Sequence, residues 1–161
     1  MIKRILFICY ANTCRTPAAE ELAKFYAKKI DLKRVTFDSA GWHIAFDHAQ
    51  PETLEFLRLK SIDITDFKPK PITRELVEKQ DLIIGMERYQ LTKIRNKFKD
   101  LKETLNGKLY TLKEFNGAAK TDLNIPDPYK TGKDRYFEVL EIVEKNIEML
   151  VKKVKQLNGT S

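Results

Sequence analysis

Residues 5–17 of the chain read ILFICYANTCRTP, and this stretch decides which fold the sequence predicts. It begins with a continuous apolar run, Ile5 to Ile8, which is typical of a strand buried on both faces of a parallel sheet. The run ends at Cys9, and a short polar stretch follows. Thr16-Pro17 then has the residues of a helix start, with Thr as N-cap and Pro in the first turn. A strand, a tight loop and a helix are therefore predicted here.

The rest of the sequence alternates between strand and helix patterns. Further strands are predicted at 35–39, 82–85 and 108–111, and helices at 16–30, 51–59, 73–79, 88–98 and 134–157, with 116–132 as a surface loop. Such alternation predicts a three-layer α/β/α fold with a central four-stranded parallel sheet and an N-terminal phosphate-binding loop. Residues 1–161 contain no repeat or linker, so a single domain is expected. Ligands bind such sheets beyond the C-terminal strand ends, where Cys9 is predicted to lie.

Composition excludes several classes of protein. The chain is 42% hydrophobic and 33% charged, as in globular proteins. No apolar run approaches the roughly 20 residues of a membrane helix, so no membrane partner and a cytoplasmic location are expected. Two cysteines and two histidines supply neither a disulfide framework nor a metal site, and no cofactor is expected. The formal net charge is +7, but its lysines are spread along the chain beside Glu, which favours a solvated surface and no nucleic-acid partner.

A thiol and an arginine bracket the loop predicted after the first strand. The N–H groups of a tight loop converge on one point, and the helix dipole adds positive potential, so the loop is suited to an oxyanion. Arg15 offers a planar fork for two phosphate oxygens, and the same field favours the Cys9 thiolate as a nucleophile toward phosphorus. Asn12 tolerates left-handed backbone, and the Thr16 hydroxyl can hydrogen-bond the Cys9 sulfur. Phosphate, sulfate or vanadate is expected to bind here.

Hydrolysis also needs a proton donor for the leaving oxygen. Asp127-Pro128-Tyr129 lies in the predicted late loop, where Pro128 stiffens the chain and Tyr129 offers an aromatic wall. Asp127 is therefore a candidate general acid. The alternative interpretation is an ordinary Asp-Pro turn.

These motifs resemble the low-molecular-weight protein tyrosine phosphatase family, which has a Cys-x-Gly-Asn-x-Cys-Arg-Ser-Pro loop and an Asp-Pro-Tyr acid loop. The resemblance extends to DSAG at 38–41 and DLIIGME at 81–87, so it covers nearly the whole chain. It implies phosphotyrosine hydrolysis through a cysteinyl-phosphate, with Cys9 as nucleophile, Arg15 as phosphate clamp and Asp127 as general acid. It implies Asn12 and Ser39 as loop supports. It also implies a substrate-binding set: Tyr10, Ala11, Asn12, Thr13, Cys14, Thr16, Trp42 and Tyr129.

Four positions depart from the family pattern. Ala11 replaces the loop Gly and would be strained at a positive φ. Thr16 replaces Ser but keeps the hydroxyl. Phe67 and Lys70 replace a His and an Arg of the network that supports Asn12.

Cys14 has two interpretations: a packing thiol, or the family's partner that traps oxidised Cys9 as a reversible disulfide.

Phosphorylated proteins are the expected substrates, and the phosphorylated residue could be tyrosine or arginine. Thr13 stands where tyrosine-directed members usually have Ile and related bacterial arginine phosphatases have Thr, so a protein-arginine phosphatase is an alternative. Tyr129 favours phosphotyrosine instead. An arsenate reductase would need redox cysteines after Cys14, and none is present. A non-catalytic phosphate-binding module is the remaining alternative.

Overall fold

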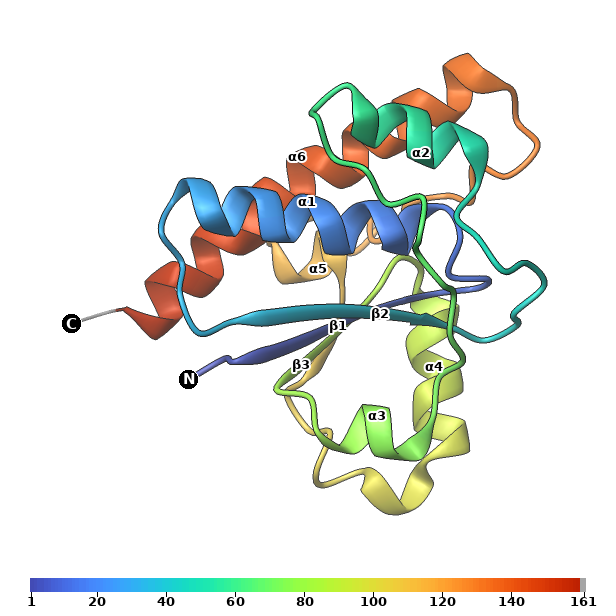
Figure 1. Ribbon diagram of the computed structural model, residues 1–161. Coiled ribbons are helices and arrows are strands. Elements are labelled where there is room, and N and C mark those ends of the chain that lie inside the picture. Colours follow the sequence, from blue (N-terminus) through green and yellow to red (C-terminus); the bar gives the residue numbers. More distant parts are fainter. Residues whose placement is uncertain (160–161) are drawn as a thin grey trace.

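The computed structural model describes residues 1–159 as a four-stranded parallel sheet with helices on both faces (Figure 1). The elements along the chain are β1 (Arg4–Cys9), α1 (Arg15–Lys29), β2 (Thr36–Gly41), α2 (Pro51–Arg58), α3 (Arg74–Glu78), β3 (Leu82–Gly85), α4 (Arg88–Lys97), the 3-10 helix η1 (Lys99–Leu101), β4 (Leu109–Thr111), α5 (Leu112–Phe115) and α6 (Lys133–Asn158). The predicted α/β architecture is confirmed.

The strand order makes β1 a central strand, so its carboxyl end lies between the carboxyl ends of two neighbouring strands. The order is β2-β1-β3-β4, and β1 pairs in parallel with both β2 and β3. The chain therefore moves first to one side of β1 and then to the other, which makes the carboxyl end of β1 the topological switch point. The register pairs Cys9 with Gly41 and Ile8 with Gly85. The loop after Cys9 thus leaves the sheet between two neighbouring strand ends.

Alternate side chains of β1 enter two separate cores, which is why the strand is apolar throughout. Ile5, Phe7 and Cys9 lie in the core beneath α1, α2, α5 and α6. Leu6 and Ile8 lie in the core beneath α3 and α4, on the opposite face (Figure 1). Burying one such Ile, Leu or Phe side chain contributes about 1.5–3 kcal/mol, so both layers hold β1 in place.

Helix α6 packs in the helical layer and is hydrogen-bonded at its end to the residues just before β1. Its predicted apolar stripe is fully buried: Tyr136, Leu140, Val143, Ile147, Leu150 and Val154. It packs along α1 (Figure 1). At its last residue, the Asn158 side chain donates to the carbonyl of Ile2 at 2.6 Å and accepts from the N–H of Ile2 at 2.7 Å. The first strand is therefore held by the last helix.

Three local predictions need correction. Thr16 was expected as the N-cap of α1, but the helix begins at Arg15 and Cys14 is its N-cap. Ala40-Gly41 was expected to end β2, yet the strand continues through Gly41, which pairs with Cys9 of β1. In addition, the Gly41 N–H donates to the Lys70 carbonyl, and the Gly41 carbonyl accepts from the Ile72 N–H. The short helix α5 was not predicted; a capping box between Thr111 and Glu114 starts it.

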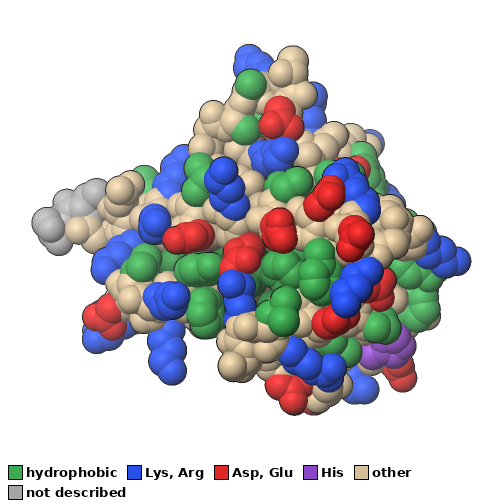
Figure 2. Space-filling view, turned by 90° about the horizontal axis from the view of Figure 1, so that it is seen from above, with side chains coloured by type: hydrophobic (Ala, Val, Ile, Leu, Met, Phe, Trp, Pro, Cys, Tyr) green, Lys and Arg blue, Asp and Glu red, His purple; other side chains and the backbone are tan. Residues whose placement is uncertain are grey.

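The charged side chains form a mixed surface. Figure 2 shows Lys and Arg interspersed with Asp and Glu over one face of the molecule. Several are paired within one helix, as in Lys24 with Glu20 at 2.8 Å. Among residues 1–159, no helix combines the length and the apolar character needed to cross a membrane.

Candidate active site

The loop between β1 and α1 turns through a left-handed residue at Asn12. Asn12 has φ +57° and is fully buried, as expected from the tolerance of Asn for this conformation. Ala11 is absent from the positive-φ residues of the described chain. The replacement of the family's Gly by Ala therefore introduces no backbone strain at this position.

A chain of hydrogen bonds connects Asn12 to the sulfur of Cys9. The Asn12 Nδ2 donates to Thr16 Oγ1 at 2.9 Å, and Thr16 Oγ1 lies 3.0 Å from Cys9 Sγ. Because the Thr16 oxygen already accepts from Asn12, its own hydrogen is free to point at the sulfur. A hydroxyl hydrogen in this position would stabilise negative charge on Cys9.

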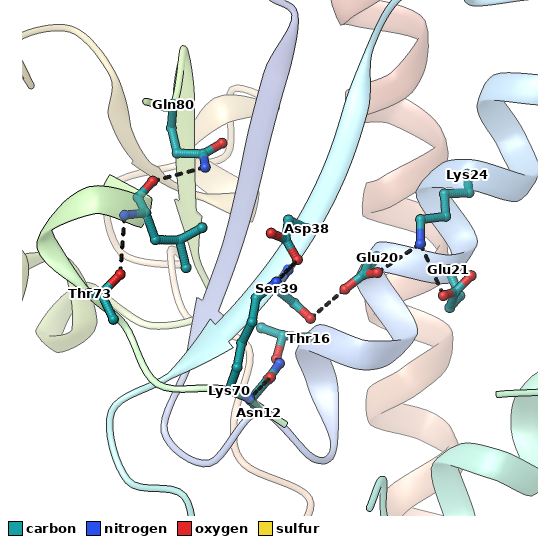
Figure 3. A network of polar contacts seen from close by, with 11 residues as sticks. Asn12, Thr16, Glu20, Glu21, Lys24, Asp38, Ser39, Lys70, Thr73 and Gln80 are labelled. Carbon is teal, nitrogen blue, oxygen red and sulfur yellow. Dashed lines mark hydrogen bonds and ion pairs between the residues drawn. The ribbon is translucent and has the colours of Figure 1, made fainter. Parts of the chain in front are cut away.

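Asn12 is still held by a hydrogen bond, although Phe67 and Lys70 replace the family's His and Arg. The backbone N–H of Lys70 donates to Asn12 Oδ1 at 3.0 Å, so the contact does not depend on which side chain stands at position 70 (Figure 3). The Lys70 ammonium pairs with Asp38 on β2. Both groups of Asn12 are thus engaged, and the left-handed turn is held from two sides.

Ser39, which the resemblance implies as a loop support, contacts helix α1. Its hydroxyl donates to Glu20 Oε1 of α1 at 2.6 Å and not to Asn12 (Figure 3). Glu20 is buried and also pairs with Lys24. Ser39 therefore ties β2 to the helix that carries Arg15.

Gly41 lets the loop pass directly over the end of β2. A Cβ at this position would lie 2.8 Å from both the carbonyl carbon of Ala11 and the nitrogen of Asn12. Both are backbone atoms, so a larger residue must displace the loop itself. Sequence reasoning treated Gly41 only as a strand breaker, and its packing role follows from the parallel pairing of β1 with β2.

We expect Gly41→Ala to reduce kcat/KM for p-nitrophenyl phosphate by about 10²-fold, because a shift of about 1 Å misplaces the anion donors. Gly117→Ala is the control: φ is +86° there and a Cβ meets nothing within 4 Å, so stability falls while the loop is untouched. Turnover and thermal unfolding of both variants check this. Equal activity of the two variants would contradict the packing role of Gly41.

Arg15 is held in a fixed orientation at the start of α1. Its side chain is almost fully buried, and one terminal nitrogen donates to Glu87 Oε1 at 2.5 Å and to the Ile125 carbonyl at 2.7 Å. Burial opposes the charged form, but Cys9, Glu87 and Asp127 together raise the pKa of Arg15, which stays cationic. The buried Nε has no partner. An unpaired buried N–H costs about 1–3 kcal/mol, which an oxyanion would offset.

The loop that carries Asp127 is anchored beside Arg15. The Ile125 N–H donates to the Met86 carbonyl at 2.9 Å, and its own carbonyl accepts from Arg15. Two residues later, Asp127 Oδ1 accepts from the Tyr129 N–H at 3.1 Å, an Asx turn that leaves the other carboxyl oxygen available. A distant part of the chain thus delivers a carboxyl group to the arginine.

These parts enclose one pocket of about 260 Å³. It is lined by Cys9, Tyr10, Ala11, Thr13, Cys14, Arg15, Ala45, Phe46, Asp127 and Tyr129. The predicted nucleophile, clamp and acid therefore meet, together with most of the predicted binding residues. Asn12 and Thr16 lie behind the loop as supports.

The prediction that Trp42 lines the pocket is corrected. Trp42 is not among the lining residues; it packs on the core beneath α4, with the Lys93 and Lys97 ammonium groups 5.1 and 5.7 Å from its ring centroid. Phe46 provides the aromatic wall instead, 6.0 Å from the ring of Tyr129. Sequence reasoning missed Phe46 because an irregular loop has no periodicity that shows which side chains point inward.

Cys14 is fixed to the helical layer behind the loop. Its carbonyl accepts from the Thr53 hydroxyl at 3.1 Å, and Thr53 also contacts the Tyr136 hydroxyl at 2.6 Å. Burial raises the pKa of the Cys14 thiol to about 11, although hydrogen bonds to Tyr136 and Thr13 oppose this. Cys14 is therefore a neutral thiol at physiological pH.

Comparison with known proteins decides the family. The model of the low molecular weight phosphotyrosine protein phosphatases matches residues 4–159. The chain belongs to this family. A probable low molecular weight protein-tyrosine-phosphatase EpsP of Ralstonia nicotianae is 28% identical over 98% of this chain and 99% of its own. A protein-arginine-phosphatase of Bacillus subtilis is 31% identical over 94% of this chain and 97% of its own.

Solved structures of family members agree with the fold. A mutant of the YwlE arginine phosphatase with a phosphorylated active-site serine has a TM-score of 0.85 at 30% identity, over 95% of this chain and 96% of that one. A low molecular weight protein tyrosine phosphatase from Bacillus subtilis has a TM-score of 0.82 at 30% identity, over 95% and 97%. The predicted family, fold and enzyme class, a phosphoric monoester hydrolase, are confirmed.

Proposed function

We propose that this phosphatase hydrolyses phosphotyrosine in proteins through a cysteinyl-phosphate on Cys9. The observation that carries the proposal is the single pocket in which Cys9, Arg15 and Asp127 meet. The Cys9 thiolate attacks phosphorus, the bond to the tyrosyl oxygen breaks, and Asp127 gives its proton to that oxygen. Asp127 then takes a proton from water, which attacks phosphorus and releases phosphate and the Cys9 thiolate.

Electrostatic stabilisation supports both steps. In this mechanism the Arg15 guanidinium and the loop N–H groups neutralise the equatorial oxygens during transfer. The Thr16 hydroxyl stabilises the sulfur as thiolate before attack and as leaving group afterwards. Inorganic phosphate, sulfate and vanadate are proposed as competitive occupants, and the cytoplasm as the site of action, since its reducing conditions keep Cys9 as a thiol.

The pocket walls favour an aromatic phosphoester. Tyr10, Phe46 and Tyr129 surround the route to Cys9, and a phenyl ring between aromatic walls gains contact energy that a short phosphoserine cannot reach. Tyr10 and Tyr129 are each about two-fifths exposed, at 43% and 39%. They are available to a bulky phosphoprotein.

A second candidate is protein-arginine phosphatase activity, and Thr13 favours it. Thr13 lines the pocket, and among residues 1–159 its hydroxyl has one hydrogen-bond contact, with Cys14 Sγ at 3.7 Å. A hydroxyl at this depth can contact the guanidinium of phosphoarginine or orient the attacking water. The relatives of this chain include enzymes of both names.

Paired peptides of one sequence, phosphorylated on tyrosine or on arginine, test the assignment. We expect a higher kcat/KM for phosphotyrosine. In Thr13→Ile the phosphoarginine rate should fall at least about tenfold, a loss of ~1.4 kcal/mol, with the phosphotyrosine rate nearly unchanged. Thr121→Ile, at an exposed threonine earlier in the same loop and outside the pocket lining, is the matched control. A wild-type preference for phosphoarginine would overturn the main proposal in favour of the second.

We expect Asp127→Asn to slow cleavage of phenyl phosphate by about 10²- to 10³-fold but that of p-nitrophenyl phosphate far less, because the nitrophenolate leaves without a proton. Single-turnover rates at pH 5–7 provide the measurement. Asp122→Asn is the control, since Asp122 pairs with Lys113 outside the pocket. Equal slowing for both leaving groups would argue against an acid role.

Cys14 is proposed as the partner that traps oxidised Cys9 as a disulfide, because both cysteines line one pocket. Since the pKa of Cys14 is raised to about 11, few molecules carry its thiolate at neutral pH. Disulfide formation is therefore expected to be slow at pH 7 and to accelerate as the pH rises.

A further inference from the structure

A second hollow, of about 470 Å³, shares no lining residue with the pocket of Cys9. Its lining residues come from the end of α4 opposite Glu87 and from the segment that leads through η1 to the start of β4. Its volume falls within the range of small-molecule sites, roughly 300–1,000 Å³. The phosphatase reaction makes no use of it.

The floor of this hollow is apolar and rigid. Phe98 and Leu105 are buried to about 95% and belong to the core beneath α3 and α4. Leu109, at the start of β4, is half-buried and packs against the same core. These side chains are fixed from behind, so the hollow offers a preformed apolar surface with an aromatic ring.

The rim of this hollow carries three cations whose charges are not neutralised. Arg95, Lys99 and Lys102 line it and are exposed. Within residues 1–159, none of the three forms an ion pair, whereas Arg74 nearby is engaged by Glu78 and Asp100. No carboxylate lines the hollow. Positive potential is therefore concentrated over an apolar floor.

We propose that this hollow binds a small aromatic anion. The aromatic body lies on Phe98, Leu105 and Leu109, and a sulfonate, carboxylate or phosphate group lies among the rim cations. Both halves of the ligand are required: the apolar floor supplies contact area, and the three charges supply attraction and orientation. Arg95 adds a planar guanidinium that can stack on the ring or hold two oxygens.

Fluorescence titration with anilinonaphthalene sulfonate tests this site in the full chain. Saturating vanadate is present throughout, so that the pocket of Cys9 is occupied. We expect one saturable site, and binding at least about tenfold weaker for the uncharged analogue phenylnaphthylamine, which is ~1.4 kcal/mol. Absence of saturable sulfonate binding, or equal affinity for the two probes, would overturn the proposal.

Charge-reversal variants locate the site. Lys99→Glu combined with Lys102→Glu should weaken sulfonate binding about tenfold or more, with phosphatase turnover unchanged. The matched control combines Lys120→Glu with Lys145→Glu, two exposed lysines without ion pairs among the described residues, for the same change in net charge. A control that weakens binding as strongly would show attraction by net charge alone and sink the proposal.

Amide chemical shifts provide an independent readout. With vanadate bound, the sulfonate probe should shift the backbone resonances of Phe98, Leu105 and Gly107 and leave those of Ala11 and Thr13 in place. Shifts confined to the phosphate loop, or spread without saturation, would assign the binding elsewhere and overturn the inference.

Discussion

Cys9→Ser is expected to abolish turnover of p-nitrophenyl phosphate, with a loss on the order of 10⁴-fold or more in kcat. A serine hydroxyl is a far weaker nucleophile toward phosphorus than a thiolate, and Thr16 Oγ1, which contacts Cys9 Sγ at 3.0 Å, is itself a hydroxyl and cannot act as its base. Steady-state kinetics measure the loss.

The same variant separates catalysis from binding. The loop amides and Arg15 do not depend on the sulfur, so calorimetry should still detect phosphate binding to Cys9→Ser. Cys14→Ser is the comparison, and it should lose far less activity because Cys14 is a neutral thiol. Unaltered turnover in Cys9→Ser would end the proposal of a cysteinyl-phosphate, and loss of folding would show as a changed unfolding temperature.

Arg15→Lys should lower kcat/KM by about 10³-fold, within the range measured for arginines that stabilise phosphoryl transfer. The single ammonium of Lys can satisfy Glu87, but it cannot also present the unpaired Nε–H to phosphate oxygens. Vanadate affinity should fall in parallel, because bound vanadate contacts the same guanidinium group of Arg15.

An exposed arginine supplies the control for this change. Arg135→Lys alters a side chain that pairs with Glu138 on the surface of α6, and turnover should remain within about twofold of the wild type, as for most surface changes. If Arg15→Lys retained full vanadate affinity, the guanidinium fork would have no part in anion binding.

The sequence predicted the sheet well because its strands are buried on both faces. The run at 82–85 coincides with β3, and the stripe of α6 is fully buried. The errors lie at element ends, where backbone partners from far along the chain decide the outcome. Gly41 continues β2 through its pairing with Cys9 and its backbone hydrogen bonds with residues 70–72, and no local pattern shows this.

The site residues that lie close together in the sequence could be predicted, but those that come from distant loops could not. Cys9, Asn12, Arg15 and Thr16 lie within one turn and meet as expected. Glu87 was quoted in the sequence comparison without a role. An acid just beyond the end of a buried parallel strand was the signal that could have identified the partner of Arg15.

The clasp between Asn158 and Ile2 has a consequence for protein synthesis. Because β1 precedes α6 in the chain, Cys9 is synthesised before Asn158 and before Tyr136, whose hydroxyl contacts Thr53. During synthesis, the nascent chain therefore carries Cys9 before the contacts that hold β1 in place can form.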